Sequence, residues 1–233
     1  MNIIALIPAR CGSKRVKDKN IRPVGDWPLM RWSVESAKQA ELFSKVIVST
    51  DSEVYAEMAR GWGAEVVMRF CVNDSQTDRY VIEDALVSLP EATQEEIDLI
   101  AYLRPTTPFR TATMLRKAVK TMVEAGDNAT GLRSVEEMGE SAFKCFTLTP
   151  GPILREIQAG KSDMPNQNVI PTYRGNGYID IAKASEIRAG RLWGDRVIGF
   201  ITPRVIEIDT EDDLQYADWY AKTRNVREEV VFR

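Results

Sequence analysis

The chain has 233 residues, 44% of them hydrophobic, and a formal net charge of −3. This length suits one large domain, and the acidic balance argues against a nucleic-acid partner. The sequence contains no histidine, which excludes Ser-His-Asp and Cys-His catalysis and histidine-based metal motifs. Any chemistry would therefore use carboxylates, Lys, Arg, hydroxyls, Cys or a metal held by oxygen.

The apolar runs and the cysteines indicate where the protein resides. No stretch approaches the roughly 20 apolar residues that span a bilayer, and the N-terminus lacks the basic region and cleavage site of a signal peptide. Cys11, Cys71 and Cys145 are odd in number and far apart, and no CxxC motif occurs. This usage is typical of a reducing compartment. We expect a cytoplasmic protein without a membrane partner, a zinc site or a disulfide framework.

Apolar runs and segments of helical periodicity alternate along the chain. Residues 2–8 are a continuous apolar run followed by a polar loop, which is typical of a buried parallel strand. Strands separated by helices in this way indicate βαβ units and a mostly parallel sheet. The further predicted strands are 45–50, 64–68, 98–103, 129–135, 178–182, 197–202 and 205–209. The predicted helices are 29–43, a segment capped by Asp51 or Ser52 that ends at Gly63, 79–89, 111–125 and 211–223.

The regular pattern weakens between residues 144 and 174, where prolines and glycines interrupt it. We interpret this segment as an excursion from the sheet, such as a hairpin arm that serves dimerisation. No repeat, low-complexity tract or flexible linker divides the rest of the sequence. We therefore expect one α/β domain over residues 1–233, with helices flanking a mostly parallel sheet and an arm at 144–174.

A basic loop, residues 10–22, follows the first predicted strand. Ligands of open α/β sheets bind beyond the carboxyl ends of the strands, and Gly12 would let the backbone approach an anion closely. Walker A and GxGxxG motifs are absent, and a Cys-x5-Arg phosphatase loop from Cys11 fails because position 17 is Lys. A solvated basic loop is the simpler alternative, but the position beyond a buried strand favours phosphate binding. The charged side chains suited to a triphosphate are Arg10, Lys14, Arg15, Lys17 and Lys19.

Four segments carry a family resemblance, in order along nearly the whole chain. They are IPARCGSKR with KDKN (residues 7–15 and 17–20), LRPTTPFR (103–110), RGNGYI (174–179) and EIDTEDDL (207–214). Together they resemble the signature of the acylneuraminate cytidylyltransferases, the CMP–sialic acid synthetases and their relatives. The chain departs from that pattern at Cys11, where Gly is usual, at Arg104, where Gln is usual, and at Glu207, where Asp is more frequent.

The resemblance implies a Rossmann-like α/β fold and a homodimer. It implies Mg²⁺-dependent transfer of CMP from CTP to the anomeric hydroxyl of an acidic nine-carbon sugar. The opening loop binds CTP in that family, and the predicted catalytic residues are Arg10, Lys19 and Asp209. The predicted CTP-binding residues are Arg10, Gly12, Ser13, Lys14, Lys19 and Asn20.

Two carboxylates are the candidate metal ligands. Glu207 and Asp209 lie two residues apart in a predicted strand, so both side chains point to one face. Adjacent carboxylates repel one another unless a cation lies between them, and Mg²⁺ prefers oxygen ligands. The alternative is an exposed strand end in which Asp209 or Thr210 caps the helix that begins at Glu211. Spacing leaves both interpretations open, and the resemblance favours the metal.

The resemblance also implies a pocket for a sugar carboxylate, which needs a bidentate cation or backbone donors. Its predicted residues are Arg104, Thr106, Arg174 and Asn176. Arg174 can equally be a surface arginine beside a tight turn, and Arg104 can either bind a carboxylate or narrow the pocket. Two other functions stay open: CTP-dependent transfer to another acidic acceptor, such as Kdo or a phosphonate, and a non-catalytic nucleotide-binding regulator.

Overall fold

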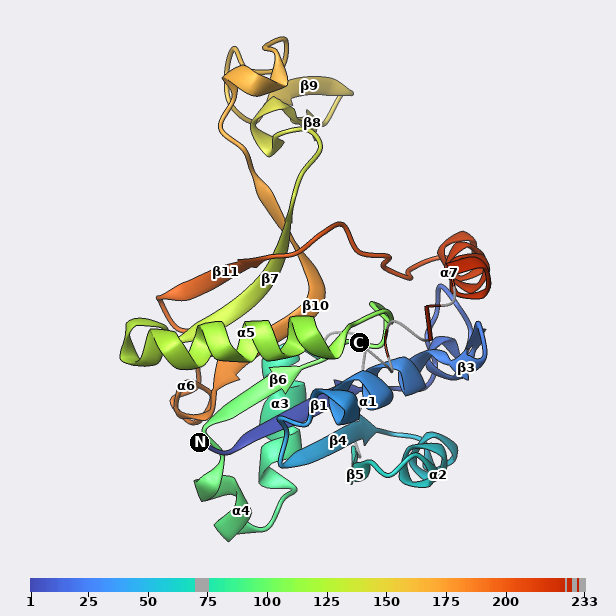
Figure 1. Ribbon diagram of the computed structural model, residues 1–233. Coiled ribbons are helices and arrows are strands. Elements are labelled where there is room, and N and C mark those ends of the chain that lie inside the picture. Colours follow the sequence, from blue (N-terminus) through green and yellow to red (C-terminus); the bar gives the residue numbers. More distant parts are fainter. Residues whose placement is uncertain (70–75, 225, 228–229, 231–233) are drawn as a thin grey trace.

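The computed structural model describes residues 1–69, 76–224, 226–227 and 230 (Figure 1). Cys71 therefore lies outside the described residues. A seven-stranded sheet forms the centre of the molecule. Its strands are β1 (Ile3–Pro8), β4 (Lys45–Thr50), β5 (Glu65–Met68), β6 (Leu99–Tyr102), β7 (Gly131–Glu137), β10 (Tyr173–Lys183) and β11 (Val197–Ile201). The helices are α1 (Leu29–Ala40), α2 (Glu53–Gly61), α3 (Asp78–Val87), α4 (Glu91–Glu96), α5 (Ala112–Ala125), α6 (Ala184–Arg188) and α7 (Glu211–Arg224).

The order of the strands across the sheet is β11-β7-β10-β6-β1-β4-β5. β10 runs antiparallel to both of its neighbours, β6 and β7. The other neighbouring strands are parallel. Because these parallel strands share one direction, β1, β4, β5 and β6 end at the same edge of the sheet. The prediction of a mostly parallel α/β sheet with flanking helices is confirmed.

Helices cover both faces of the sheet, and β1 shows why its sequence is continuously apolar. Ile3, Ala5 and Ile7 pack on the face covered by α1 and α5. Ile4 and Leu6 point to the opposite face, which α3 and α6 cover. Successive side chains of a strand alternate between faces, so a strand that is buried on both sides needs an apolar residue at every position.

The predicted helices and strands agree with the structure to within a few residues, with one exception. The prediction of a strand at residues 205–209 is wrong. The segment belongs to no strand, although burial alternates along it: Ile208 is fully buried between the exposed Glu207 and the half-buried Asp209. It crosses the loop after β6, where the Ile208 amide donates to the carbonyl of Thr106 at 2.8 Å. The sequence analysis also missed α4, α6 and the short antiparallel pair β2 (Pro23–Val24) and β3 (Trp27–Pro28).

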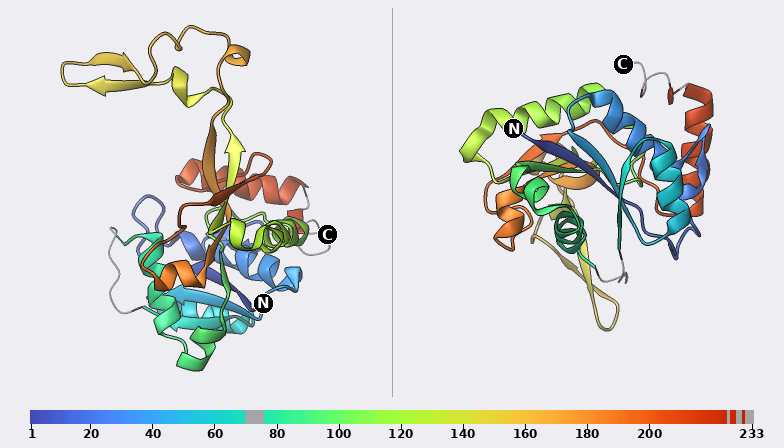
Figure 2. Two further views of the ribbon diagram at one scale, coloured as in Figure 1. Left: turned by 90° about the vertical axis from the view of Figure 1, so that its left-hand side faces the viewer. Right: turned by 90° about the horizontal axis from the view of Figure 1, so that it is seen from below.

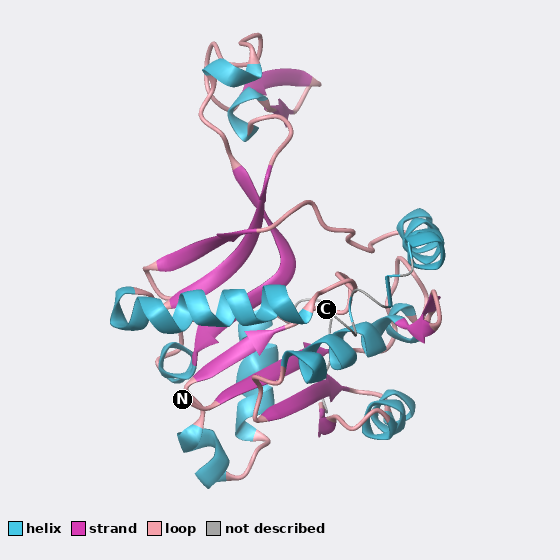
Figure 3. Ribbon diagram, viewed as in Figure 1, coloured by secondary structure: helices cyan, strands magenta, loops and turns pink. Residues whose placement is uncertain are grey.

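An arm projects from the sheet where the sequence analysis places the excursion (Figures 1 and 2). β7 and β10 continue beyond the sheet as a pair, with Arg174 opposite Glu136. Figure 3 shows the two strands crossing below the tip. At the tip, β8 (Phe146–Thr149) and β9 (Ile153–Glu156) form an antiparallel hairpin that extends sideways (Figure 2).

Helix α7 closes the molecule beside the basic loop. It packs on β2 and β3 through a small apolar cluster that includes Trp27, Trp32 and Leu214. The amide of Gly25 donates to the Asp218 carboxylate at 2.9 Å. These contacts hold the segment before α7 next to the basic loop. Within the described part of the chain, every helix is too short or too polar to cross a membrane.

The fully buried Arg110 fixes the loop that follows β6. Its guanidinium donates to the backbone carbonyls of Arg104, at 2.5 Å, of Gly177, at 2.9 Å, and of Tyr178. It also donates to Ser33 Oγ on α1 at 3.0 Å. All four acceptors are neutral, so burial lowers the pKa of Arg110 to about 9. One side chain thereby ties the loop to β10 and α1.

Replacing Arg110 by Met, which has a similar reach but no donors, leaves these buried acceptors unsatisfied. We expect Arg110→Met to lower the free energy of unfolding by about 2–4 kcal/mol, because each orphaned buried group costs about 1–3 kcal/mol and removal of a desolvated charge offsets part of this. Urea unfolding followed by circular dichroism measures the change. A free energy of unfolding within about 0.5 kcal/mol of the wild type would contradict this role.

Candidate active site

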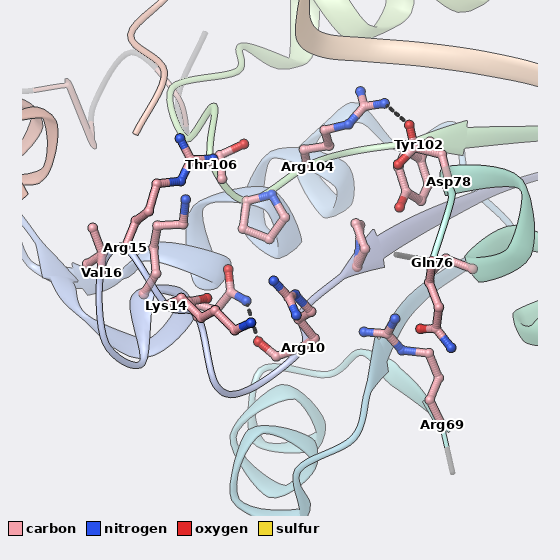
Figure 4. Close-up of a pocket in the computed structure, with 16 residues that line it drawn as sticks. Arg10, Lys14, Arg15, Val16, Arg69, Gln76, Asp78, Tyr102, Arg104 and Thr106 are labelled. Atoms are coloured by element: carbon pink, nitrogen blue, oxygen red, sulfur yellow. Dashed lines mark hydrogen bonds and ion pairs between the residues drawn. The ribbon is translucent and has the colours of Figure 1, made fainter. Parts of the chain in front are cut away.

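A cavity of about 520 Å³ opens at the edge where β1, β5 and β6 end (Figure 4). The basic loop after β1 forms one side, and the loop after β6 forms another. The end of β5 and the start of α3 complete the wall. The predicted site residues that line this cavity are Arg10, Ser13, Lys14, Lys19, Asn20, Arg104 and Thr106.

Five predicted site residues are not among the described residues that line the cavity: Gly12, Arg174, Asn176, Glu207 and Asp209. The sequence analysis missed another group that does line it, namely Arg69, Gln76, Asp78 and Tyr102. Their common signal was present in the sequence, because each lies at the carboxyl end of a predicted strand or just before a predicted helix.

Hydrogen bonds from a side chain and from the backbone help to hold the basic loop in place. Gly12 has a positive φ of 70°, which glycine adopts without strain. The buried Asn20 donates from its amide nitrogen to the carbonyl of Arg10 at 2.9 Å. On the other side, the Cys11 amide donates to Asp51 at 2.7 Å. Asn20 therefore helps to fix the shape of the basic loop.

Cys11 replaces the glycine that is usual in the resembling family, and its thiol has a defined partner. Sγ donates to the second carboxylate oxygen of Asp51 at 3.4 Å. Burial, followed by the hydrogen bond and negative charge of Asp51, raises the pKa of the thiol. The thiol therefore stays protonated and acts as a second tether between the loop and the end of β4.

Lys19 connects the basic loop to the carboxylate segment. Its Nζ donates to the carbonyl of Ile208 at 2.7 Å and lies 3.4 Å from Asp209 Oδ1. The guanidinium of Arg15 lies 3.2 Å from the same oxygen. Burial lowers the pKa of Lys19, and the charge of Asp209 opposes that effect. Asp209 thus lies at the rim of the cavity, in contact with two residues that line it.

The first turn of α7 shows which residues cap this helix. Asp213 accepts hydrogen bonds from the amides of Asp209, at 3.0 Å, and Thr210, at 2.8 Å. The Thr210 hydroxyl in turn accepts from the amide of Asp213 at 3.2 Å. This reciprocal arrangement resembles a capping box. Thr210 and Asp213 cap the helix. The side chain of Asp209 instead contacts Arg15 and Lys19 at the rim of the cavity.

Glu207 and Asp209 have the chemistry of a partial Mg²⁺ site. Desolvation of Glu207, together with the negative charge of Asp209, raises the pKa of Glu207. Among the described residues, no group of three His, Cys, Asp or Glu side chains could hold a metal ion. Mg²⁺ often binds one or two carboxylates and completes its coordination with phosphates and water, so a pair of carboxylates fits that ion.

The predicted sugar-binding residues are divided between two places. Arg104 lines the cavity with both terminal nitrogens paired to carboxylates, Asp180 at 2.5 Å and Asp78 at 2.6 Å. Arg174 lies at the base of the arm, where its guanidinium donates to Glu136 at 2.6 Å. The buried Asn176 donates to the Thr202 hydroxyl at 2.6 Å. In this chain Asn176 and Arg174 hold the base of the arm to its neighbouring segments.

Comparison with known proteins identifies the class of enzyme. The family model described as Cytidylyltransferase matches residues 4–149. The chain belongs to this family, which confirms the predicted enzyme class.

Two relatives and one solved structure show how far the likeness extends. N-acylneuraminate cytidylyltransferase of Escherichia coli O18:K1:H7 is 31% identical over 92% of this chain, which spans only 50% of that relative. CMP-N,N'-diacetyllegionaminic acid synthase of Legionella pneumophila is 31% identical over 80% of each chain. The solved structure of a CMP:2-keto-3-deoxy-manno-octonic acid synthetase with CTP matches with a TM-score of 0.73 at 14% identity, covering 96% of this chain and 100% of its own. That likeness shows the shared fold.

Proposed function

We propose that this chain transfers CMP from CTP to the anomeric hydroxyl of a nonulosonic acid and releases pyrophosphate. The observation that carries the proposal is the cavity itself. Cationic side chains of the basic loop face it from one side, and Lys19 joins that loop to the Glu207–Asp209 pair at its rim. The names of the two relatives, which act on N-acylneuraminate and on a legionaminic acid derivative, support the choice of acceptor.

The proposed reaction is an in-line attack of the sugar hydroxyl on the α-phosphorus of CTP, and different residues serve different parts of it. Arg10, Lys14 and Lys19 hold the phosphates and orient them, since positioning and charge neutralisation supply most of the acceleration in such transfers. Asp209 and Glu207 would hold Mg²⁺, which when bound offsets negative charge on the phosphate oxygens. The tethers from Asn20 and Cys11 keep the basic loop in shape before CTP arrives.

The proposed reaction is tested by pyrophosphate release from CTP and Mg²⁺ with a panel of acceptors. The panel contains N-acetylneuraminic, legionaminic and pseudaminic acids and Kdo. We expect release with at least one nine-carbon acid and the formation of its CMP derivative. Release of pyrophosphate with Kdo alone would show that the acceptor is Kdo and not a nine-carbon acid. CTP binding without release in the presence of any acceptor would favour the nucleotide-binding regulator.

Asp209→Asn separates the metal role of this carboxylate from its structural contacts. We expect kcat to fall about 10³-fold, because lost charge stabilisation of several kcal/mol corresponds to that factor. The melting temperature should stay close to that of the wild type, since Asp209 is half-exposed. Chelation of Mg²⁺ should abolish turnover of the wild type, and added Mg²⁺ should restore it. Asp212→Asn changes an exposed carboxylate in the first turn of α7, three residues after Asp209, and is the control that should remain active. A fully active Asp209→Asn enzyme would contradict the assignment.

We propose further that the arm pairs two copies of the chain. An isolated two-stranded hairpin is marginally stable in water, yet β8 and β9 lie away from the sheet at the tip of the arm (Figure 2). Leu148, Ile153 and Leu154 are 60–69% exposed there. Burial of this apolar surface against a second copy would stabilise both the hairpin and a homodimer.

The cross-strand pair Leu148 and Leu154 provides a test of the dimer. In Leu148→Lys/Leu154→Glu the opposite charges preserve the hairpin and remove its apolar face. We expect the wild type to be dimeric and this variant monomeric in light scattering coupled to gel filtration. Val54→Lys removes an apolar side chain of 60% exposure from α2 and should leave the dimer intact. A variant that stays dimeric would contradict a role of the hairpin in assembly.

The cytoplasm is the proposed location, because CTP, the proposed donor, is supplied there. The described cysteines Cys11 and Cys145 are free thiols, as expected in a reducing compartment.

A further inference from the structure

A buried carboxylate lies where the arm leaves the sheet. Glu136 is near the end of β7, and its side chain is 5% exposed. One of its oxygens accepts from the guanidinium of Arg174 on β10, from Nε at 2.9 Å and from a terminal nitrogen at 2.6 Å. The other oxygen accepts from the backbone amide of Val205 at 3.0 Å. Glu136 therefore contacts the arm with one oxygen and the segment before α7 with the other.

The segment before α7 connects the sheet to the carboxylates at the rim of the cavity. Figure 1 shows it running from the end of β11, past the base of the arm, towards α7. Its backbone is anchored at Thr202, which pairs with β7, and at Ile208, which binds the loop after β6. Between these two anchors, in a stretch that the structure describes throughout, Val205 has the one backbone amide that makes a hydrogen bond. The bond to Glu136 therefore limits where the chain can place Glu207, two residues further on.

Glu136 is charged although it is buried. Burial alone would raise the pKa of this carboxyl, but the hydrogen bonds from the Val205 amide and from Arg174 outweigh that effect and hold the pKa below its usual range. A buried carboxylate without such donors is strongly unfavourable. Hydrogen bonds to a charged acceptor are also stronger than those to a neutral one. Each oxygen is thus firmly held by its own partner.

We propose that Glu136 is a positioning residue for Glu207: by holding the Val205 amide, it places the Glu207 carboxylate beside that of Asp209. The proposed ligand of the two carboxylates is a divalent cation, so this inference rests on the proposed function. Asp209 is held separately, because its amide donates to Asp213 in the first turn of α7. The amide of Glu207 makes no such bond in the described structure, so its placement depends on the anchor at Val205.

Two double variants with the same net charge isolate this anchor from the ion pair of the arm. Glu136→Gln/Arg174→Met removes both charges but leaves one side-chain oxygen, which can accept from the Val205 amide. Glu136→Met/Arg174→Met removes that oxygen as well. We expect the first variant to bind the cation within about twofold of the wild type. The second should bind it roughly tenfold more weakly, because the loss of one hydrogen bond corresponds to about that factor.

The affinity is measured with Mn²⁺, which suits the same oxygen ligands as Mg²⁺. Mn²⁺ is titrated into the enzyme with equimolar CTP and no acceptor, so that the proposed transfer cannot occur. The relaxation rate of water protons reports the Mn²⁺ that the protein holds. Asp209→Asn should abolish this binding and thereby identifies the site. Glu186→Met/Arg191→Met removes an ion pair of similar exposure, 12% and 58%, at α6, and should bind Mn²⁺ as the wild type does.

Equal Mn²⁺ affinities in the two double variants would overturn the positioning role of Glu136. A lower melting temperature of Glu136→Met/Arg174→Met without weaker Mn²⁺ binding would show that the residue only supports the fold. If that variant does not fold, Glu136→Gln alone replaces it. Its single oxygen is shared between Arg174 and Val205, so we expect about threefold weaker binding, and unchanged binding would overturn the proposal.

The absence of an acceptor keeps this test separate from the test of the proposed reaction. If none of the acids in the panel is turned over but Mn²⁺ binding follows the expected order, the proposed transfer fails and the role of Glu136 stands. If turnover is found but the two double variants bind Mn²⁺ equally, the role of Glu136 fails and the proposed transfer stands.

Discussion

The buried guanidinium of Arg110 is the constraint on which the geometry of the site depends. It holds the carbonyls of Arg104, Gly177 and Tyr178 together with Ser33 of α1. The loop after β6 is thereby fixed, and the carbonyl of Thr106 in that loop holds Ile208. Lys19 then binds the carbonyl of Ile208 from the basic loop. One desolvated cation, hydrogen-bonded to four neutral acceptors, thus fixes how segments from opposite ends of the chain meet.

The net charge of −3 does not describe the cavity, because positive and negative side chains gather on different sides of it. The basic loop supplies cations on one side, and the carboxylate of Asp209 lies at the rim, where it contacts Arg15 and Lys19. Lys19 and Arg15 lie where the basic loop meets the segment before α7, and both contact Asp209. Such an arrangement suits the triphosphate and the divalent cation of the proposed reaction, since each would offset charge that the other meets. The local distribution therefore matters more to function here than the overall balance.

Local patterns predicted the fold well because a strand that is buried on both faces is apolar at every position, and such a continuous apolar run is easily seen in the sequence. The basic loop was found for the same reason, since it directly follows the most apolar strand. Residues 205–209 were misassigned as a strand because Ile alternates with acidic residues there, and this pattern is not specific to a strand. Whether such a segment pairs in a sheet depends on neighbours that are distant in the sequence. Asp78 and Arg69 were missed because they lie at the start of α3 and directly after β5, and only the shared edge of the sheet brings them to the cavity. The position of Arg174 depends on its register opposite Glu136, which the sequence does not specify.

The departure from the family pattern at position 104 is best understood as part of a set. A lone arginine lining the cavity would be a partly desolvated cation, and a lone Asp180 would be a buried carboxylate; either is costly without its partner. Paired, and joined by Arg133 and Asp78, they form a neutral network that can lie against the cavity. A neutral glutamine at position 104 would leave Asp180 without its closest cation. Arg104, Asp78 and Asp180 are therefore expected to depend on one another, so that a change at one of these positions requires a change at the others.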